Sequence, residues 1–148
     1  MNVQTTRFGV VEIDAQRIIT FPAGLLGFSS FKRYAVLQPD EDGIFYWLQC
    51  IDCPELAFVV TDPALWAPGY QATIRREQME HLELASLDEA RVFVIVNRYD
   101  RTLTANLQGP LVINAGTRQG MQLVLAEKRW TTRYEIVQLG EPAHAVPA

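Results

Sequence analysis

Residues 103–125 constrain the fold more than any other part of the chain. Apolar and polar residues alternate there in three short runs, 103–107, 111–115 and 121–125. A period of two is typical of β-strands that turn one face towards a hydrophobic core. Gly109-Pro110 separates the first run from the second, and the segment 114–120, with two glycines, separates the second from the third. The pattern predicts three consecutive antiparallel strands, a meander.

The rest of the chain continues this β-rich pattern. Further strands are predicted over residues 7–13, 16–21, 33–38, 44–51, 56–61, 91–98 and 130–139. The first two are expected to form a hairpin about Asp14-Ala15, and the apolar run 92–96 is expected to be buried on both faces. So many short strands favour a sandwich or a barrel.

Residues 75–84 form the best helix candidate. Met79 and Leu82 lie three positions apart, while a polar face is expected to carry Glu77, Glu80 and Glu83. A helix this short depends on tertiary packing for its stability. We expect the three glutamates to be solvent-exposed, and we consider them as candidates for contact with a partner.

Length and charge limit the functional classes. A chain of 148 residues, of which 49% are hydrophobic, is most simply one domain, expected over residues 1–139 with a flexible tail over 140–148. The sequence has no apolar run long enough for a membrane span and no basic-then-apolar leader at its start, which predicts a cytoplasmic protein. A net charge of −4 disfavours direct binding to nucleic acid.

Three motifs, in order along the chain, resemble the flagellar assembly factor FliW family. They are Phe21-Pro22-x-Gly24-Leu25-x-Gly27-Phe28, then Phe58-Val59-Val60-Thr61-Asp62-Pro63, then Leu103-Thr104-x-Asn106-Leu107-x-x-Pro110-Leu111-Val112-Ile113-Asn114 followed by Arg118-x-Gly120-x-Gln122. The resemblance covers about residues 8–137. With it, the fold class becomes a mainly β, single small antiparallel β-barrel-like domain with one or two short helices.

The resemblance also implies a function. FliW-like proteins are non-enzymatic and need no cofactor or metal. They bind flagellin in the cytoplasm and antagonise the RNA-binding translational regulator CsrA, which couples the flagellin level to flagellin translation. A member is expected to be a monomer when free, with no membrane or direct nucleic-acid partner. The family-motif positions are expected to be structural: Phe21, Pro22, Gly24, Gly27, Phe28, Asn106, Pro110, Asn114 and Gln122.

The loop that contains the first motif is unusually apolar. Its glycines permit positive φ and its proline fixes one φ, so the loop should be well defined. We expect Leu25, Leu26 and Phe28 to plug one end of the core. Contact of these residues with a partner is the alternative.

Cys50-Ile51-Asp52-Cys53 is a C-x-x-C motif, and a thiol-redox protein is therefore one alternative. A redox thiolate is usually stabilised at a helix N-terminus, but the residues after Pro54 predict a strand. Zinc would need two more ligands, and His81 and His144 lack the required spacing. Plain packed cysteines are the favoured interpretation.

The segment 128–134 mixes basic and aromatic residues and leaves a β-barrel RNA-binding module as the other alternative. Bases would stack on Trp130 and Tyr134 beside the cations. On an acidic protein, an edge strand or a protein-binding surface is favoured. Its candidate partner-binding residues are Arg129, Trp130 and Arg133. Nucleophile elbows, phosphate-binding loops and dinucleotide-binding fingerprints are all absent from the sequence.

Overall fold

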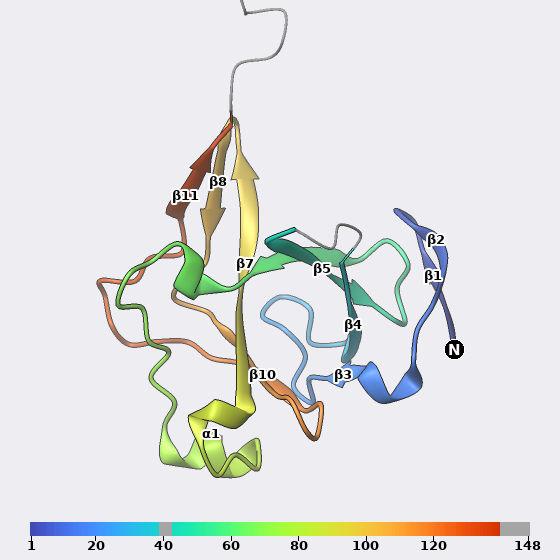
Figure 1. Ribbon diagram of the computed structural model, residues 1–148, viewed down its shortest axis with the longest axis horizontal. Helices are drawn as coiled ribbons and strands as arrows, with labels where there is room; N and C mark the ends of the chain where they lie inside the picture. Colours follow the sequence, from blue (N-terminus) through green and yellow to red (C-terminus); the bar gives the residue numbers. More distant parts are fainter. Residues whose placement is uncertain (39–42, 140–148) are drawn as a thin grey trace, which may run out of the picture.

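The fold is a curled antiparallel sheet that forms a half-barrel (Figure 1). The computed structural model describes residues 1–38 and 43–139. The predicted tail over 140–148 lies outside these residues. The strands within them are β1 (Asn2–Thr5), β2 (Gly9–Glu12), β3 (Ile19–Thr20), β4 (Arg33–Leu37), β5 (Phe45–Cys50), β6 (Ala57–Thr61), β7 (Ala90–Tyr99), β8 (Thr102–Ala105), β9 (Leu111–Asn114), β10 (Gly120–Gln122) and β11 (Tyr134–Gln138).

The sheet runs in the order β10-β9-β7-β6-β5-β4-β3; β8 also pairs with β7, and β11 pairs with β8. The long strand β7 pairs with β9 along its first half, Ala90–Phe93, and with β8 along its second half, Val96–Tyr99. The predicted meander is therefore wrong in one respect: β9 and β10 form a hairpin, but β8 and β9 do not pair with each other. The break at Gly109-Pro110 carries the chain from one end of β7 towards the other.

The two ends of this sheet come together where β3 meets the turn between β9 and β10. The N–H of Thr20, in β3, donates to the carbonyl of Arg118, in the turn between β9 and β10, at 2.9 Å. Thr20 and Gln119 form an isolated parallel bridge at the same place. This contact joins the opposite ends of the curl, so β3 lies beside the β9–β10 turn.

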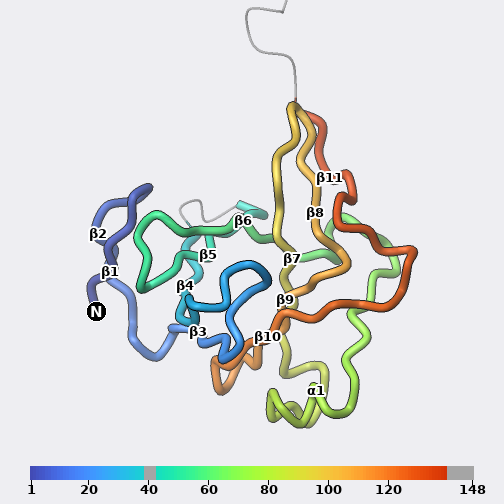
Figure 2. Tube along the Cα trace, turned by 180° about the vertical axis from the view of Figure 1, so that it is seen from behind, coloured from blue at the N-terminus to red at the C-terminus, as the bar shows by residue number. Residues whose placement is uncertain are grey.

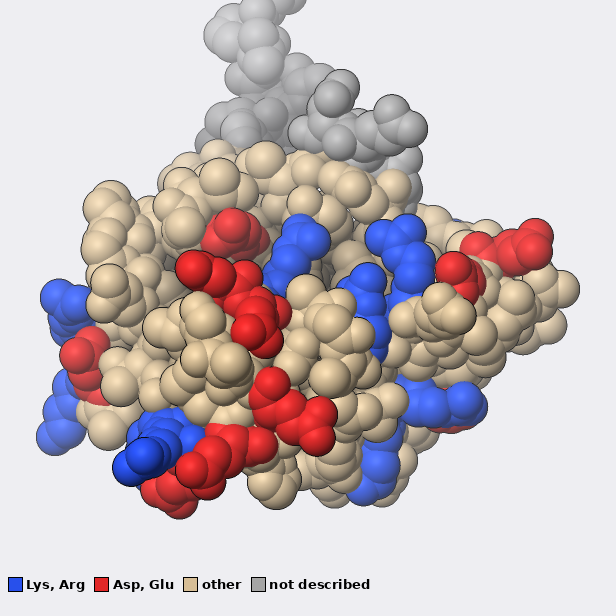
Figure 3. Space-filling view, turned by 60° about the horizontal axis from the view of Figure 1, so that its bottom comes forward, with Lys and Arg blue, Asp and Glu red and all other residues tan. Residues whose placement is uncertain are grey.

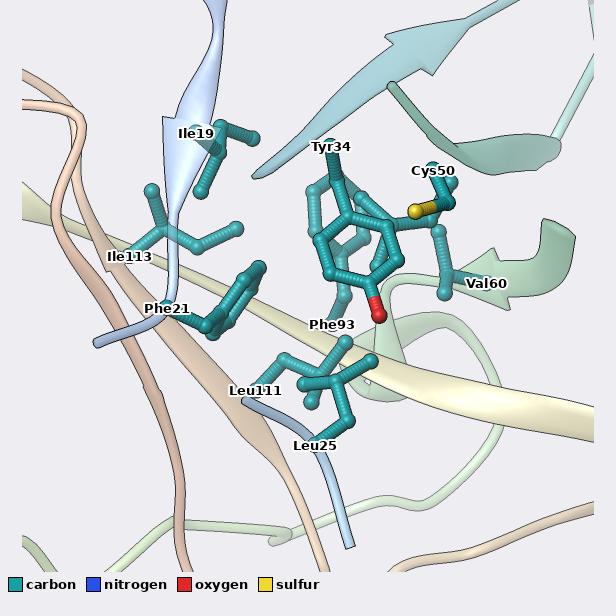
Figure 4. Packing of buried hydrophobic residues seen from close by; sticks show 10 residues of the cluster. Ile19, Phe21, Leu25, Tyr34, Cys50, Val60, Phe93, Leu111 and Ile113 are labelled. Carbon is teal, nitrogen blue, oxygen red and sulfur yellow. The ribbon is translucent and has the colours of Figure 1, made fainter. Parts of the chain in front are cut away.

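The concave side of the curl encloses the first hydrophobic core (Figure 4). Phe21 and Tyr34, both fully buried, meet edge to face with ring centroids 5.6 Å apart. Burial of each large apolar side chain contributes about 1.5–3 kcal/mol. The rest of this cluster is Ile19, Leu25, Leu48, Cys50, Val60, Phe93, Leu111 and Ile113.

A second core lies on the other face of β7 and β9. Neighbouring residues on these strands belong to different cores: Phe93 to the first and Val94 to the second, Ile113 to the first and Val112 to the second. The predicted burial of the apolar run on both faces is confirmed. The second core also contains Ala67, Leu82, Leu84, Ala105, Leu107, Leu123, Leu125 and Trp130.

The predicted N-terminal hairpin and the predicted start of the last strand are wrong. The N-terminal hairpin is β1–β2, while Ala15–Arg17 is a 3-10 helix (η1), because the Asp14 side chain caps it by accepting from Gln16 N. The last strand begins at Tyr134 instead of residue 130. Short 3-10 turns also occur at Pro63–Leu65 (η2) and Leu87–Glu89 (η3).

The predicted helix over residues 75–84 is only six residues long, α1 (Arg76–His81). It ends before Glu83, whose φ of 55° lies in the left-handed region that a continuing α-helix excludes. Glu83 therefore does not extend the helical face that carries Glu77 and Glu80. Figure 1 shows α1 at the lower end of β7, away from β8 and β11.

Candidate functional site

The loop that follows β3 is an irregular segment whose backbone is fixed by internal hydrogen bonds and by a glycine. It crosses beside β9 and β10, as Figure 2 shows in blue. Gly24 has φ +70°, and a Cβ there would lie 2.6 Å from the Cα of Ser29, so the fold requires glycine at this position. The carbonyl of Phe21 accepts from Gly24 N at 2.8 Å, and the carbonyl of Leu25 accepts from Phe28 N at 2.8 Å.

The loop divides its apolar side chains between core and solvent. Leu25 is 2% exposed and belongs to the first core, whereas Leu26 is 61% exposed. Phe28 is 37% exposed and meets the Phe58 ring edge to face at 5.1 Å. The predicted plug is therefore right for Leu25 and wrong for Leu26, because the turn at Gly24 points successive side chains in opposite directions.

Gln122 connects this loop to the turn that precedes β9. Its Oε1 accepts from Leu26 N at 2.8 Å, and its Nε2 donates to the carbonyl of Gly109 at 3.1 Å. Asn106 holds the same turn from the other side, since its Oδ1 accepts from Gln108 N at 3.1 Å and Gly109 N at 3.0 Å. The first and third motifs thus meet in space, and Pro110 lies buried at their junction.

Asn114 connects β9 to the end of α1. Its Nδ2 donates to the carbonyls of Leu82 at 2.8 Å and Glu83 at 3.3 Å. Its Oδ1 accepts from Gly116 N at 2.9 Å and Thr117 N at 3.1 Å. The side chain is only 3% exposed, and both its amide nitrogen and its oxygen are paired with backbone groups.

A groove of about 430 Å³ runs between the loop, β10 and the end of α1. Leu26 lines it together with Met121 and His81, and Pro22, Gly24 and Gly27 line its loop side. A partly exposed apolar surface on a loop held by side-chain hydrogen bonds is suited to binding another protein. Local sequence patterns do not indicate the groove, because its residues come from three distant segments.

The predicted acidic surface on α1 is less acidic than the sequence indicates. Glu77, Glu80 and Glu83 are all exposed, and Arg76 Nε lies 4.0 Å from Glu80 Oε1. Figure 3, which brings the lower side of the molecule forward, shows acidic and basic side chains interspersed on this face. An exposed pair of this kind contributes little to stability.

The predicted basic and aromatic surface is also divided by the fold. Trp130 is 7% exposed and packs edge to face on Tyr70 at 4.8 Å, so it is a core residue and not a surface one. Arg129 lies over the Trp130 ring at 4.5 Å and pairs with Glu127 at 3.3 Å. Arg133 is exposed and lies over Tyr99 at 4.2 Å. The two arginines thus contact different aromatic residues.

The C-x-x-C segment has the features of packed cysteines. Cys50 is fully buried and Cys53 half-buried, both are free, and the Cys53 thiol donates to Glu55 Oε2 at 3.6 Å. Burial raises the pKa of the Cys50 thiol, the opposite of the shift that a reactive thiolate needs. Gln49, which no sequence motif singles out, places its Nε2 within hydrogen-bonding distance of carbonyls in this turn, including Pro54 O at 3.1 Å.

Two further classes of site find no support in the described part of the chain. It contains no group of three or more His, Cys, Asp or Glu side chains placed to hold a metal ion. None of the helices within residues 1–38 and 43–139 has the length and apolar character that a membrane crossing requires.

A curled β-sheet with a fixed loop and an adjoining groove defines a small β-barrel-like protein. Comparison with known proteins identifies the family: the model of the FliW protein family matches residues 2–136, and the chain belongs to this family. The fold agrees, because the crystal structure of the flagellar assembly factor FliW superimposes with a TM-score of 0.84 at 30% identity, covering 91% of this chain and 96% of that one.

Relatives from several bacteria are similar over nearly the whole chain. The flagellar assembly factor FliW of Bdellovibrio bacteriovorus is 41% identical over 138 residues, covering 92% of this chain and 79% of its own. That of Syntrophus aciditrophicus is 40% identical over 140 residues, covering 93% and 89%. The resemblance seen in the three motifs is thereby confirmed.

Proposed function

We propose that this protein is a cytoplasmic, non-enzymatic factor that binds flagellin and antagonises the translational regulator CsrA. When flagellin is scarce, the protein occupies CsrA and relieves repression of flagellin translation. When flagellin accumulates, it takes the protein away and repression resumes. The observation that carries this proposal is the family match over residues 2–136.

The geometry supports a binding role in a specific way. Leu26 presents an apolar side chain to solvent from a loop fixed by Gln122, beside the groove lined by Met121. A loop that is already ordered loses little conformational entropy on binding. We propose that this surface contacts one of the two protein partners, and that the chain acts as one folding unit over residues 1–139.

The two alternative functions lack comparable support. A thiol-redox role requires a stabilised thiolate, whereas burial raises the pKa of Cys50. An RNA-binding role for the segment 128–134 requires an exposed aromatic platform, whereas Trp130 is buried. We therefore propose that neither chemistry at Cys50 and Cys53 nor direct nucleic-acid binding belongs to the function, and that the free protein is a monomer.

The proposal is tested by affinity capture with purified flagellin and CsrA. Each partner should be retained by the tagged protein, and added flagellin should release bound CsrA. Failure to retain either partner would overturn the proposal. Leu26→Asp should weaken capture of at least one partner, while Leu65→Asp, at a leucine 57% exposed in η2, serves as the matched control.

A further inference from the structure

A second and larger cavity, of about 740 Å³, is lined by residues of β2, η1, β4 and the first part of β7. Its lining includes Val36, Tyr46, Phe93 and Ile113, all of which belong to or pack against the first core. The cavity therefore continues the apolar interior of the half-barrel out to solvent. Mouths of β-barrels are common places for binding sites, and the volume lies in the usual range of about 300–1,000 Å³.

Three arginines from separate elements line this cavity. Arg17 ends η1, Arg91 is the second residue of β7, and Arg118 lies in the turn between β9 and β10. Within the described part of the chain, none of the three guanidinium groups has a carboxylate at ion-pair distance. Three such cations at one cavity stand out on a chain whose net charge is −4.

Arg91 is held in a defined position although it is exposed. Its guanidinium carbon lies 4.7 Å from the centre of the Phe93 ring and 5.5 Å from that of Tyr46. A guanidinium stacked on an aromatic ring keeps its N–H groups directed sideways, where they can bind both oxygens of one carboxylate. The site thus combines an oriented anion-binding group with an aromatic surface.

Arg118 is positioned by the fold in a different way. Its φ is +64°, and its carbonyl accepts from Thr20 N in the contact that joins the ends of the sheet. The residue is half-buried, so its backbone is fixed at the rim of the cavity. A fixed backbone limits the positions that the cationic side chain can reach.

The same cavity is lined by two carboxylates, Glu12 and Asp14. Asp14 already accepts from Gln16 N through Oδ1. Carboxylates at the rim repel the uninterrupted row of phosphates in a nucleic-acid backbone, whereas an acidic peptide carries negative charge only at individual side chains, which can be placed at the arginines. The oxygens of the rim carboxylates can accept hydrogen bonds from the backbone N–H groups of a peptide. A rim that carries both positive and negative side chains over an apolar floor therefore favours a peptide.

We propose that this cavity binds an extended acidic segment of a partner protein. A carboxylate of the segment binds Arg91 and Arg118, and an adjacent apolar side chain enters against Val36 and Tyr46, which are partly exposed in the cavity. Arg17 adds attraction at the rim. The inference concerns a different surface from the groove at Leu26, and it stands whether or not flagellin or CsrA supplies the segment.

The test is a peptide array probed with the purified protein. Its short peptides combine aspartate or glutamate with leucine or phenylalanine. Matched series carry the corresponding amides or lysines, and an RNA oligonucleotide is tested separately. The acidic series should bind, at least about tenfold more tightly than the amide series, since charge-assisted hydrogen bonds are lost in the amides. Equal binding of both series, preferred binding of RNA, or no binding of any acidic peptide would overturn the proposal.

Substitutions of the lining arginines test whether the peptide binds in the cavity. Arg91→Gln and Arg118→Gln should each weaken the tightest acidic peptide by at least about tenfold, and Arg91→Lys should recover only part of the loss because it keeps the charge without the planar fork. Arg76→Gln removes the same charge from α1 and should change nothing. Thermal melts establish that the cavity variants are folded. If folded variants bind the peptide as tightly as the unmodified protein, the site is refuted.

Discussion

The side chain of Gln122 accepts a hydrogen bond from the backbone N–H of Leu26, a residue 96 positions earlier in the chain. Through its other end the same side chain donates to the carbonyl of Gly109. One glutamine therefore fixes an exposed apolar loop relative to the turn before β9.

Replacement of Gln122 by alanine should loosen the loop more than it destabilises the protein. The loss of two partly exposed hydrogen bonds should lower the free energy of unfolding by about 1–2 kcal/mol. Hydrogen exchange at the Leu26 amide should accelerate, while exchange in β7 remains slow. Gln71→Ala, at an exposed position, is the control. Unchanged exchange at Leu26 would show that the loop orders itself.

Asn114→Ala should be among the most destabilising polar substitutions in the chain. It leaves the carbonyl of the buried Leu82 and the N–H groups of the exposed Gly116 and Thr117 without their side-chain partner, which should cost about 2–4 kcal/mol. Partner binding should fall together with the melting temperature. Asn106→Ala removes two bonds and should cost less. An Asn114→Ala protein of normal stability that no longer binds would instead place Asn114 in an interface.

Gly120→Ala tests the close packing of β10 on the loop. A Cβ at this position would lie 2.6 Å from the ring of fully buried Phe21, so the ring must shift. Overpacking of this kind should cost about 1–3 kcal/mol, measured by chemical denaturation. Gly116→Ala places its Cβ 3.4 Å from Asn114 Oδ1 and should be tolerated better. Equal stability of the two variants would contradict the packing argument.

Replacing both cysteines by serine should leave partner binding intact at a cost of about 1–2 kcal/mol. The pH dependence gives a second readout for Cys50. Because burial raises its pKa in the folded state, the unfolded chain loses this proton first. The stabilisation is complete below the unfolded pKa and is lost as pH rises through the folded one. Cys50→Ala should therefore reduce the alkaline loss of stability, and loss of binding by the folded double variant would revive the redox interpretation.

Glu77, Glu80 and Glu83 provide a test of electrostatic antagonism towards CsrA. An RNA-binding surface is rich in cations, and exposed carboxylates on a bound factor would repel RNA within a Debye length of about 8 Å. The triple Gln variant should retain flagellin binding but associate with CsrA or displace RNA less well, more so at low salt. Arg76 lies near Glu80, and its positive charge weakens the repulsion between this surface and RNA. Wild-type displacement of RNA at both low and high salt would eliminate the idea.

The apolar run in β7 illustrates what sequence alone predicts well. Its continuous apolar residues predict a strand buried on both faces, and the break at Gly109-Pro110 predicts a change of strand. The partner of each strand was not predictable, because β7 is long enough to pair with β8 and β9 end to end. The assumption that consecutive strands pair failed there for a geometric reason.

The surface sites were less accessible to prediction. Leu25 and Leu26 are neighbours with the same side chain, and only the turn at Gly24 and the distant Gln122 decide which one faces solvent. Arg17, Arg91 and Arg118 form no local pattern, since the curl of the sheet alone places them around one cavity. Trp130 was misplaced because its basic neighbours are exposed while its own ring packs on Tyr70.

The contact between Thr20 and Arg118 has a consequence for the order of events during synthesis. Translation delivers the N-terminal strands long before residue 118 leaves the ribosome, so the curl stays open while most of the chain is being made. Contacts between such distant residues also slow folding, because a long loop must close before they contribute. The loop at Leu26 gains its anchor at the same late stage. A nascent chain that is stopped before β10 therefore lacks both the closed curl and the anchor of the Leu26 loop.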